Sequence, residues 1–375
     1  MKTLIPQPQQ TREDLTNHWR SLALLSIALV LLPNIFKFVN RPVHGLTENR
    51  RLAARPQFPN TFSELTSYPG RLDQYIRDNF PLRTNLIVWS NTLRYVFGYS
   101  GSNAVIVGRH GWLFYDDGSH LKFWRGLRLS DADMAAWMQD FRTRITSLNQ
   151  RGIRLYLLFP PYKETIYPEK LPFWLRVHSK TGLDQLIEKL KAAALDDHLI
   201  DVRKQLLAAK DPSCLLYYKF DTHWNSLGAY IAYRELMTRI HKDFPDLNAL
   251  PIKSFPQREQ NEDGDLAFML GIGNRVSTSI QRGYYFYIEP KTDWLTTRRD
   301  VLAPRIIHTG IHNGRTLMLT KDSYSNALLP FLAHNFERIA VSYVEEGFFR
   351  EDLIEKVHPD IVLIESVEQF CGIAF

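Results

Sequence analysis

The sequence predicts an α/β domain built on a mostly parallel sheet with helices on both faces. Amphipathic stretches alternate with short apolar stretches from Ser130 onward, and the same alternation resumes after Arg315. The 375 residues have 45% hydrophobic and 13% aromatic content, so they can bury a substantial core in one large domain or two modest ones. We therefore expect a globular α/β protein, preceded by an N-terminal membrane anchor helix.

The expected anchor spans residues 21–39. An apolar run begins after Arg20 and continues past Pro33 to Val39. Its length is near the lower limit of the roughly 17–25 residues that cross a bilayer, and no small-residue cleavage site follows closely. Basic residues on both sides slightly oppose export, but long domains translocate largely regardless of charge. We expect residues 1–20 in the cytoplasm, an uncleaved single-pass anchor, and an exported remainder.

Residues 40–104 are expected to form a helical lead-in to the main domain. Apolar residues recur at helical spacing in 62–79 and again in 86–95. The aromatic stretch 111–115, flanked by turn-prone glycine and aspartate residues, predicts a strand. Its aromatic side chains either pack in the core or stack on a sugar ring.

The main domain is expected to span residues 105–375. Its first helix begins at Ser130 and ends at Gly152, with Asp133 placed to complete the N-terminal cap. The remaining predicted elements are helices at 183–195, 326–333 and 350–357, and strands at 153–159, 199–202, 315–320, 339–341 and 361–364. This order is typical of a parallel sheet covered on both faces.

Three separated polar residues have the chemistry of a serine nucleophile system. Asp221 and His223 are two positions apart, which puts both side chains on one side of an extended segment or a tight loop. Ser323 follows a predicted strand and precedes a predicted helix, the edge at which open α/β sheets bind ligands. A serine needs a histidine to take its proton and a third group to fix the histidine tautomer, in any chain order. The ordinary alternative is a structural histidine and a turn serine.

Several short motifs occur in a fixed order along the chain: Glu48-Asn49-Arg50, Asp78-Asn79-Phe80-Pro81-Leu82-Arg83, Gly108-Arg109-His110-Gly111-Trp112-Leu113-Phe114-Tyr115, Pro160-Pro161-Tyr162-Lys163, Tyr167-Pro168-Glu169-Lys170-Leu171-Pro172, Phe220-Asp221-Thr222-His223-Trp224-Asn225 and Lys321-Asp322-Ser323-Tyr324-Ser325. This ordered set resembles the alginate O-acetyltransferase group, the AlgX/AlgJ-like proteins. It is most similar to the single-domain, membrane-anchored AlgJ-like kind, because the chain ends at Phe375, without room for the added carbohydrate-binding module of AlgX-type members.

The resemblance implies an SGNH-hydrolase-like three-layer sandwich with a permuted motif order. It implies Ser323 as the nucleophile, His223 as the general base and Asp221 as the partner that orients the base. The implied protein is a periplasmic or extracytoplasmic O-acetyltransferase, held at the inner membrane by its N-terminal helix. It would move an acetyl group through an acetyl-serine intermediate onto hydroxyls of an exported polysaccharide, either an alginate-like exopolysaccharide or a cell-wall polymer.

We expect no soluble cofactor, because the sequence has no Gly-rich phosphate loop or other cofactor-binding motif. The immediate acetyl donor is therefore expected to be another protein. The resemblance implies that this partner is a multi-pass membrane O-acyltransferase.

Four further residues are candidates for contact with substrate or with an oxyanion: Asn225, Asn326, Tyr324 and Lys163. Either asparagine could instead hold its turn through a backbone hydrogen bond, and the lysine is either an exposed site for an acidic sugar or an ordinary solvated charge. Trp224 is expected to pack and fix the histidine loop. Lys321 stands where the wider SGNH pattern commonly has glycine, which puts hydrolase behaviour in doubt, and Asp322 could cap the following helix.

Charge and cysteine content argue against other classes. The formal net charge is +6, but the basic residues are spread along the chain without a patch or a reading motif, so we expect no nucleic-acid partner. Cys214 and Cys371 have no metal-ligand spacing and either form one disulfide in an exported domain or remain separate thiols. The histidines show no paired spacing, so no metal is expected.

Two other functions remain open from the sequence. A carbohydrate acetyl-esterase would use the same three residues with water as the acceptor. A non-catalytic polysaccharide-binding scaffold of a membrane acetylation complex would have an inert Ser323.

Overall fold

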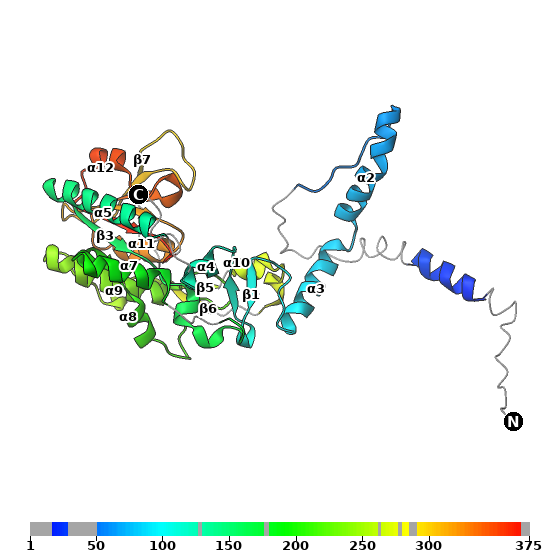
Figure 1. Cartoon of the computed structure of the whole chain (residues 1–375), viewed down its shortest axis with the longest axis horizontal. Coiled ribbons are helices and arrows are strands. Elements are labelled where there is room, and N and C mark those ends of the chain that lie inside the picture. The colour runs from blue at the N-terminus through cyan, green and yellow to red at the C-terminus, as the bar shows by residue number, and fades with distance from the viewer. Residues whose placement is uncertain are drawn as a thin grey trace, which may run out of the picture. The chain divides into compact units, whose positions relative to one another are not determined.

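The structure is a computed structural model that describes residues 17–28, 51–126, 130–175, 180–261, 264–276, 280–284 and 291–368 (Figure 1). The chain divides into two compact units, Met1–Leu93 and Arg94–Phe375. All of the candidate site residues lie in the second unit.

The first unit is helical over much of the part that the structure describes. Residues 17–28 are helical, α2 spans Phe62–Asn79, and α3 (Arg83–Val96) begins in this unit. At the start of α2, the side chain of Thr61 accepts a hydrogen bond from the backbone N–H of Glu64, as expected for an N-cap. The two helices predicted for the lead-in are confirmed.

None of the described helices is long and apolar enough to cross a membrane. Of the predicted anchor, residues 21–28 belong to the N-terminal helix, and residues 29–39 lie outside the described residues. The anchor remains a prediction from the sequence.

A seven-stranded mixed sheet forms the centre of the second unit. Its strand order is β4-β3-β11-β9-β10-β8-β7. The first five strands run parallel, and β8 and β7 join antiparallel at one edge. The strands are β3 (Arg154–Leu158), β4 (Leu199–Ile200), β7 (Lys291–Trp294), β8 (Arg305–His308), β9 (Thr316–Lys321), β10 (Arg338–Tyr343) and β11 (Ile361–Glu365). The predicted mostly parallel sheet is confirmed, and its antiparallel edge is an addition to the prediction.

Helices cover both faces of this sheet (Figure 1). Successive strand side chains point to opposite faces, so Leu317 and Leu319 of β9 belong to one buried cluster and Met318 to another. The first cluster includes α9 and α11, and the second includes α5, α7 and α12. These helices are α5 (Asp131–Gln150), α7 (Gly182–Ala192), α9 (Ser226–Asp243), α11 (Ser325–Leu332) and α12 (Glu351–Val357). The predicted three layers are confirmed.

The β-hairpin of β1 (Val105–Val107) and β2 (Leu113–Tyr115) packs with α10 (Asp265–Met269) around Phe220. The predicted strand at 111–115 is shorter than expected, because a 3-10 turn ending in Gly111, at a φ of +73°, precedes it. Trp112 and Phe114 are buried, so core packing is the role of these rings and sugar stacking is not.

The remaining described elements connect these parts. They are α4 (His120–Trp124), α6 (Lys163–Ile166), α8 (Arg203–Ala208) and the antiparallel pair β5 (Gln257–Asn261) and β6 (Ile280–Tyr284).

Candidate active site

Ser323 lies in a tight turn between β9 and α11, and its side chain is exposed. The carboxylate of Asp322 accepts hydrogen bonds from the backbone N–H of Tyr324 at 2.8 Å and of Val367 at 2.6 Å. Because Val367 follows β11, these bonds tie the turn to the end of the neighbouring strand. The hydroxyl of Ser323 is thereby held at the carboxyl edge of the sheet, where α/β folds bind ligands.

His223 lies in the loop that leads into α9. The side-chain oxygen of Asn225 caps this helix by accepting from the backbone N–H groups of Leu227 and Gly228, both at 3.0 Å. The cap fixes the direction in which the chain leaves the loop, and so it fixes the position of His223 two residues earlier.

Two hydrogen bonds in opposite directions join the histidine loop to the serine turn. The indole Nε1 of Trp224 donates to the carbonyl of Tyr324 at 2.9 Å, and the hydroxyl of Tyr324 donates to the carbonyl of Thr222 at 3.0 Å. Both rings are buried. The prediction that Trp224 packs and fixes the histidine loop is confirmed.

The imidazole of His223 bridges a carboxylate and a hydroxyl. Its Nε2 lies 2.7 Å from Oγ of Ser323, and its Nδ1 lies 2.7 Å from Oδ1 of Asp221. A carboxylate beside Nδ1 favours the tautomer with the proton on Nδ1, which leaves Nε2 to accept the serine proton. The structure thus brings the three predicted residues into one hydrogen-bonded chain.

The electrostatics of this chain favour a charged pair between Asp221 and His223. Burial alone would lower the pKa of His223, but the hydrogen bond and charge of Asp221, with the charges of Asp265 and Asp322, outweigh it and raise that pKa. Burial alone would raise the pKa of Asp221, but its bond to His223 outweighs it and lowers that pKa. The imidazole is therefore a stronger proton acceptor than an unperturbed histidine.

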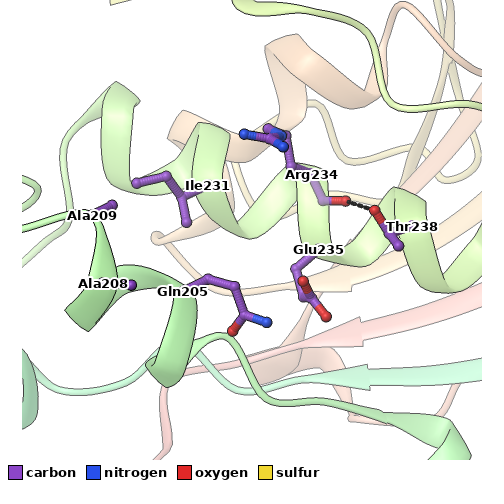
Figure 2. A pocket seen from close by; sticks show the side chains of 7 residues that line it. All are labelled: Gln205, Ala208, Ala209, Ile231, Arg234, Glu235 and Thr238. Carbon is purple, nitrogen blue, oxygen red and sulfur yellow. Dashed lines mark hydrogen bonds between the residues drawn. The ribbon is translucent and has the colours of Figure 1, made fainter.

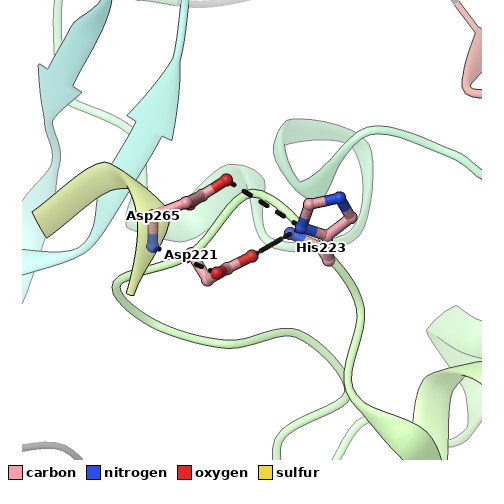
Figure 3. Close-up of side chains that lie close together, drawn as sticks. All are labelled: Asp221, His223 and Asp265. Carbon is pink, nitrogen blue, oxygen red and sulfur yellow. Dashed lines mark hydrogen bonds and ion pairs between the residues drawn. The ribbon is translucent and has the colours of Figure 1, made fainter. Parts of the chain in front are cut away.

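Asp265 is a site residue that the sequence reasoning missed. Figure 3 shows its carboxylate beside that of Asp221 on the Nδ1 side of His223, with Oδ2 at 3.9 Å from Nδ1. It is the first residue of α10, and nothing around it in the sequence marks it as a site residue. Asp265 reaches the site only because α10 packs against Phe220, and that contact is not visible in the sequence.

Asp221, His223 and Asp265 form a group that has the ligand types for a metal ion. Each carboxylate oxygen in this group already accepts a hydrogen bond, however. Those of Asp265 accept from Thr222, and those of Asp221 accept from His223 and from the N–H of Asp265. Hydrogen bonds from groups within the protein therefore account for the close grouping of these three side chains.

The expectation of an exposed Lys163 is wrong. Its side chain is 2% exposed, and its Nζ donates to the backbone carbonyls of Asp221 at 2.6 Å and Tyr218 at 3.2 Å. The ammonium group therefore holds the backbone of the Asp221 segment, which leaves neither a solvated charge nor a sugar contact.

Three other predicted roles also need correction. The amide of Asn225 is used in the α9 cap and in a bond from its Nδ2 to the carbonyl of Leu215, so it is not an oxyanion donor. The hydroxyl of Tyr324 is committed to the backbone of the histidine loop, so it is not a substrate contact. Asp322 does not cap α11, because its bond goes to the N–H of the N-cap residue itself.

Asn326 is the one secondary candidate whose side chain is exposed beside Ser323. Its Oδ1 accepts a hydrogen bond from the buried Nζ of Lys321 at 2.8 Å, and the same ammonium donates to the carbonyl of Asp322 at 2.8 Å. Lys321 thus orients the Asn326 amide so that its nitrogen is the end available to another acceptor.

A surface cavity of about 320 Å³ lies between α8 and α9 (Figure 2). Arg234, Glu235 and Thr238 of α9 line it, together with Gln205 of α8. None of its lining residues belongs to the hydrogen-bonded chain of Ser323, and the lining has no paired nucleophile and base.

Comparison with known families identifies the fold of the site. The family model described as "SGNH hydrolase-like domain, acetyltransferase AlgX" matches residues 105–305, more than half of the chain. The chain belongs to the AlgX acetyltransferase family. The matched range includes Asp221, His223 and Asp265 and ends before Ser323.

Among curated proteins, the chain is similar to several that are called probable alginate O-acetylase AlgJ. It is 29% identical to the Pseudomonas aeruginosa protein over 202 residues, which are 51% of this chain and 47% of that protein. It is 28% identical to the Pseudomonas fluorescens protein over 222 residues, 56% of this chain and 53% of that protein. The chain spans about half the length of the curated relatives that it matches.

Among solved structures, the AlgX-family chain is similar to Bacillus cereus PatB1 with a sulfonyl adduct. The TM-score is 0.52 at 16% identity, over 69% of this chain and 94% of PatB1. It is also similar to a DHHW family protein from Eubacterium siraeum, with a TM-score of 0.50 at 17% identity over 72% and 92% of the two chains. Likeness at these identities shows the SGNH-hydrolase-like α/β fold and nothing finer.

Proposed function

We propose that this protein is an O-acetyltransferase that moves an acetyl group, through an acetyl-Ser323 intermediate, onto a hydroxyl of an exported polysaccharide. The observation that carries the proposal is the chain of two 2.7 Å contacts from Ser323 through His223 to Asp221, in a member of an acetyltransferase family. An exposed serine bonded to an oriented imidazole is the arrangement that nucleophilic acyl transfer requires.

In the first half-reaction, Oγ of Ser323 attacks the carbonyl carbon of the donor's acetyl group and its proton passes to Nε2 of His223. The tetrahedral intermediate then releases the donor group, which takes the proton from Nε2. The products are acetyl-Ser323, a neutral imidazole and the deacetylated donor. Asp221 stabilises the imidazolium that exists between these two proton transfers.

In the second half-reaction, a sugar hydroxyl gives its proton to Nε2 and its oxygen attacks the acetyl carbon on Ser323. The bond to Oγ breaks, the proton returns to Oγ, and the acetylated sugar leaves. The same base serves both halves, so we expect ping-pong kinetics.

Two donors, one in the serine turn and one at the start of α11, are candidates to stabilise the oxyanion. Within the described residues, the backbone N–H of Ser323 and the Nδ2 group of Asn326 have no acceptor. Lys321 holds the oxygen of that amide, which keeps the nitrogen as the donor. One group is the N–H of the nucleophile itself and the other lies in the first turn of α11, so we propose that both donate to the negative charge that forms on the acetyl oxygen.

The same proposal extends to location and partners. We propose residues 1–20 as cytoplasmic, 21–39 as a single-pass anchor in the inner membrane, 40–104 as the lead-in, and 105–375 as a periplasmic catalytic domain. The names of the AlgJ relatives support an alginate-like acceptor, and the resemblance described above supports a multi-pass membrane O-acyltransferase as acetyl donor.

The proposal is tested by acetyl transfer with the full chain in detergent. An activated acetyl ester serves as donor and oligosaccharides, including mannuronate oligomers, serve as acceptors, and the wild-type protein is compared with Ser323→Ala. We expect acetylated sugar from the wild type and none above background from the variant.

Two outcomes would contradict the transferase. Acetate release that depends on Ser323, without any sugar product, would establish the esterase. Ester turnover that is equal in the wild type and a folded Ser323→Ala variant would support the non-catalytic scaffold instead.

A further inference from the structure

The carboxylate of Asp265 binds the residue that lies between Asp221 and His223. Its Oδ1 accepts from the backbone N–H of Thr222 and its Oδ2 accepts from the Thr222 hydroxyl, both at 2.8 Å. In the reverse direction, the backbone N–H of Asp265 donates to Oδ2 of Asp221 at 3.1 Å. These three bonds join the start of α10 to the segment of Asp221 and His223, with donors on both partners.

The backbone of α10 makes a second attachment to the same segment. The N–H groups of Leu266 and Ala267 both donate to the carbonyl of Phe220, at 3.1 and 3.2 Å. The approach is so close that a Cβ atom on Gly264 would lie 2.8 Å from the Phe220 carbonyl oxygen, so only glycine fits there. The packing of the α10 backbone against Phe220 therefore fixes the backbone position of Asp265.

We propose that Asp265 is a positioning residue for the acyl transfer: it holds the Asp221-Thr222-His223 segment in register with Ser323 and places a second carboxylate beside Nδ1 of His223. This inference rests on the proposed function and adds a residue to it. It goes beyond the three-residue chain, because Asp265 contacts neither Ser323 nor Nε2 and acts through its neighbours.

The second carboxylate changes the electrostatics of the imidazole. His223 faces Asp221, Asp265 and Asp322, and Lys163 donates to the backbone carbonyl of Asp221. Asp265 interacts with the charges of Asp221 and His223, and its own charge acts on Tyr115. Burial and the charge of Asp221 raise the pKa of Asp265, while the charge of His223 and the hydrogen bonds from Thr222 act in the opposite direction.

A purely structural turn is the alternative to this role. An aspartate that only closes a turn would need no imidazole at 3.9 Å and would not alter its proton affinity. Asp211 offers that case in the same chain, because its Oδ1 accepts from the N–H and the hydroxyl of Ser213, both at 2.7 Å, and within the described residues no histidine is among its hydrogen-bond partners. Asp211→Asn is therefore the matched control for Asp265→Asn.

The experiment measures His223 directly and then the rate. The imidazole of His223 is titrated by NMR in the full chain in detergent, and kcat/KM with an activated acetyl ester is measured across pH. Three variants are compared with the wild type: Asp265→Asn, Asp265→Glu and Asp211→Asn. Thermal unfolding of each variant reports whether it is folded.

We expect His223 in Asp265→Asn to titrate at a lower pH than in the wild type, because one negative charge has gone. The acid limb of kcat/KM should move to lower pH with it, and the plateau should fall about tenfold because Thr222 loses an acceptor. Asp265→Glu should keep the wild-type titration of His223 and lose plateau rate, and Asp211→Asn should match the wild type in both.

An unchanged His223 titration in folded Asp265→Asn, with a rate loss that is equal at every pH, would overturn the proposal in favour of a structural turn. The NMR titration needs no substrate. If the wild-type protein transferred no acetyl group, the proposed function would fail, and the effect of Asp265 on His223 would still be decided by this measurement.

Discussion

Asp221 and Asp322 each lie beside a reacting side chain, but the two carboxylates have different partners. Asp221 accepts from the ring of His223, and that bond lowers its pKa against the effect of burial. Asp322 is next to Ser323 yet accepts from the backbone N–H groups of Tyr324 and Val367, and burial raises its pKa. Both carboxylates accept from backbone N–H groups, but only that of Asp221 also accepts from an ionisable ring.

The difference separates a carboxylate that takes part in proton transfer from one that holds the backbone of the serine turn. A buried carboxylate beside an imidazole stabilises the charge that forms on the ring. A buried carboxylate that accepts from backbone amides and no ring nitrogen satisfies donors that would otherwise be unpaired, and so it contributes to the stability of the turn. We therefore expect substitution of Asp221 to lower mainly the rate, and substitution of Asp322 to lower mainly the stability.

The largest expected effect is that of Asp221→Asn on the rate. An amide donates where the carboxylate accepts, so it favours the wrong tautomer of His223 and cannot stabilise the imidazolium. We expect kcat/KM for an activated acetyl ester to fall by about 10³–10⁴-fold, with little change in stability in denaturant unfolding. A loss of less than tenfold in a folded variant would remove Asp221 from the proton chemistry.

A smaller effect on the rate, and a larger one on stability, is expected for Asp322→Ala. The variant leaves the buried N–H groups of Tyr324 and Val367 without their acceptor, so we expect the free energy of unfolding to fall by about 2–4 kcal/mol. Denaturant unfolding measures this directly. Asp322→Asn is the control, because its amide oxygen keeps one of the two acceptors and should restore part of the stability. If Asp322→Asn instead matched Asp221→Asn in rate loss and left stability unchanged, the contrast between the two aspartates would not hold.

The parts of the site that depend on local pattern were predictable from the sequence. The strand, the turn of Ser323 and the following helix are contiguous, and their apolar and polar order is visible in 315–333. The pairing of His223 with Ser323, 100 positions away, was a hypothesis from residue types that depended on the family resemblance for its support. Chain pattern alone does not encode which loops meet at a sheet edge.

The parts that depend on tertiary contacts were missed. Asp265 is 43 positions from Thr222, and it reaches the site because α10 packs on Phe220 through Gly264. Lys163 was expected at the surface because a lysine is usually solvated. It is buried instead, and two backbone carbonyls accept hydrogen bonds from its ammonium group. The two antiparallel strands, β8 and the edge strand β7, are short and only partly buried, so they lack the apolar run of the central strands.

The most direct test of the account is to identify the residue that carries the acetyl group during turnover. The full chain is mixed briefly with an activated acetyl ester, quenched in acid, digested and analysed by mass spectrometry, beside the Ser323→Ala variant. We expect an acetyl group on the peptide that contains Ser323 in the wild type, absent from the variant, and lost when an acceptor sugar is added before the quench. Sugar acetylation without any acetyl group on Ser323, or with the acetyl group on another residue, would contradict it.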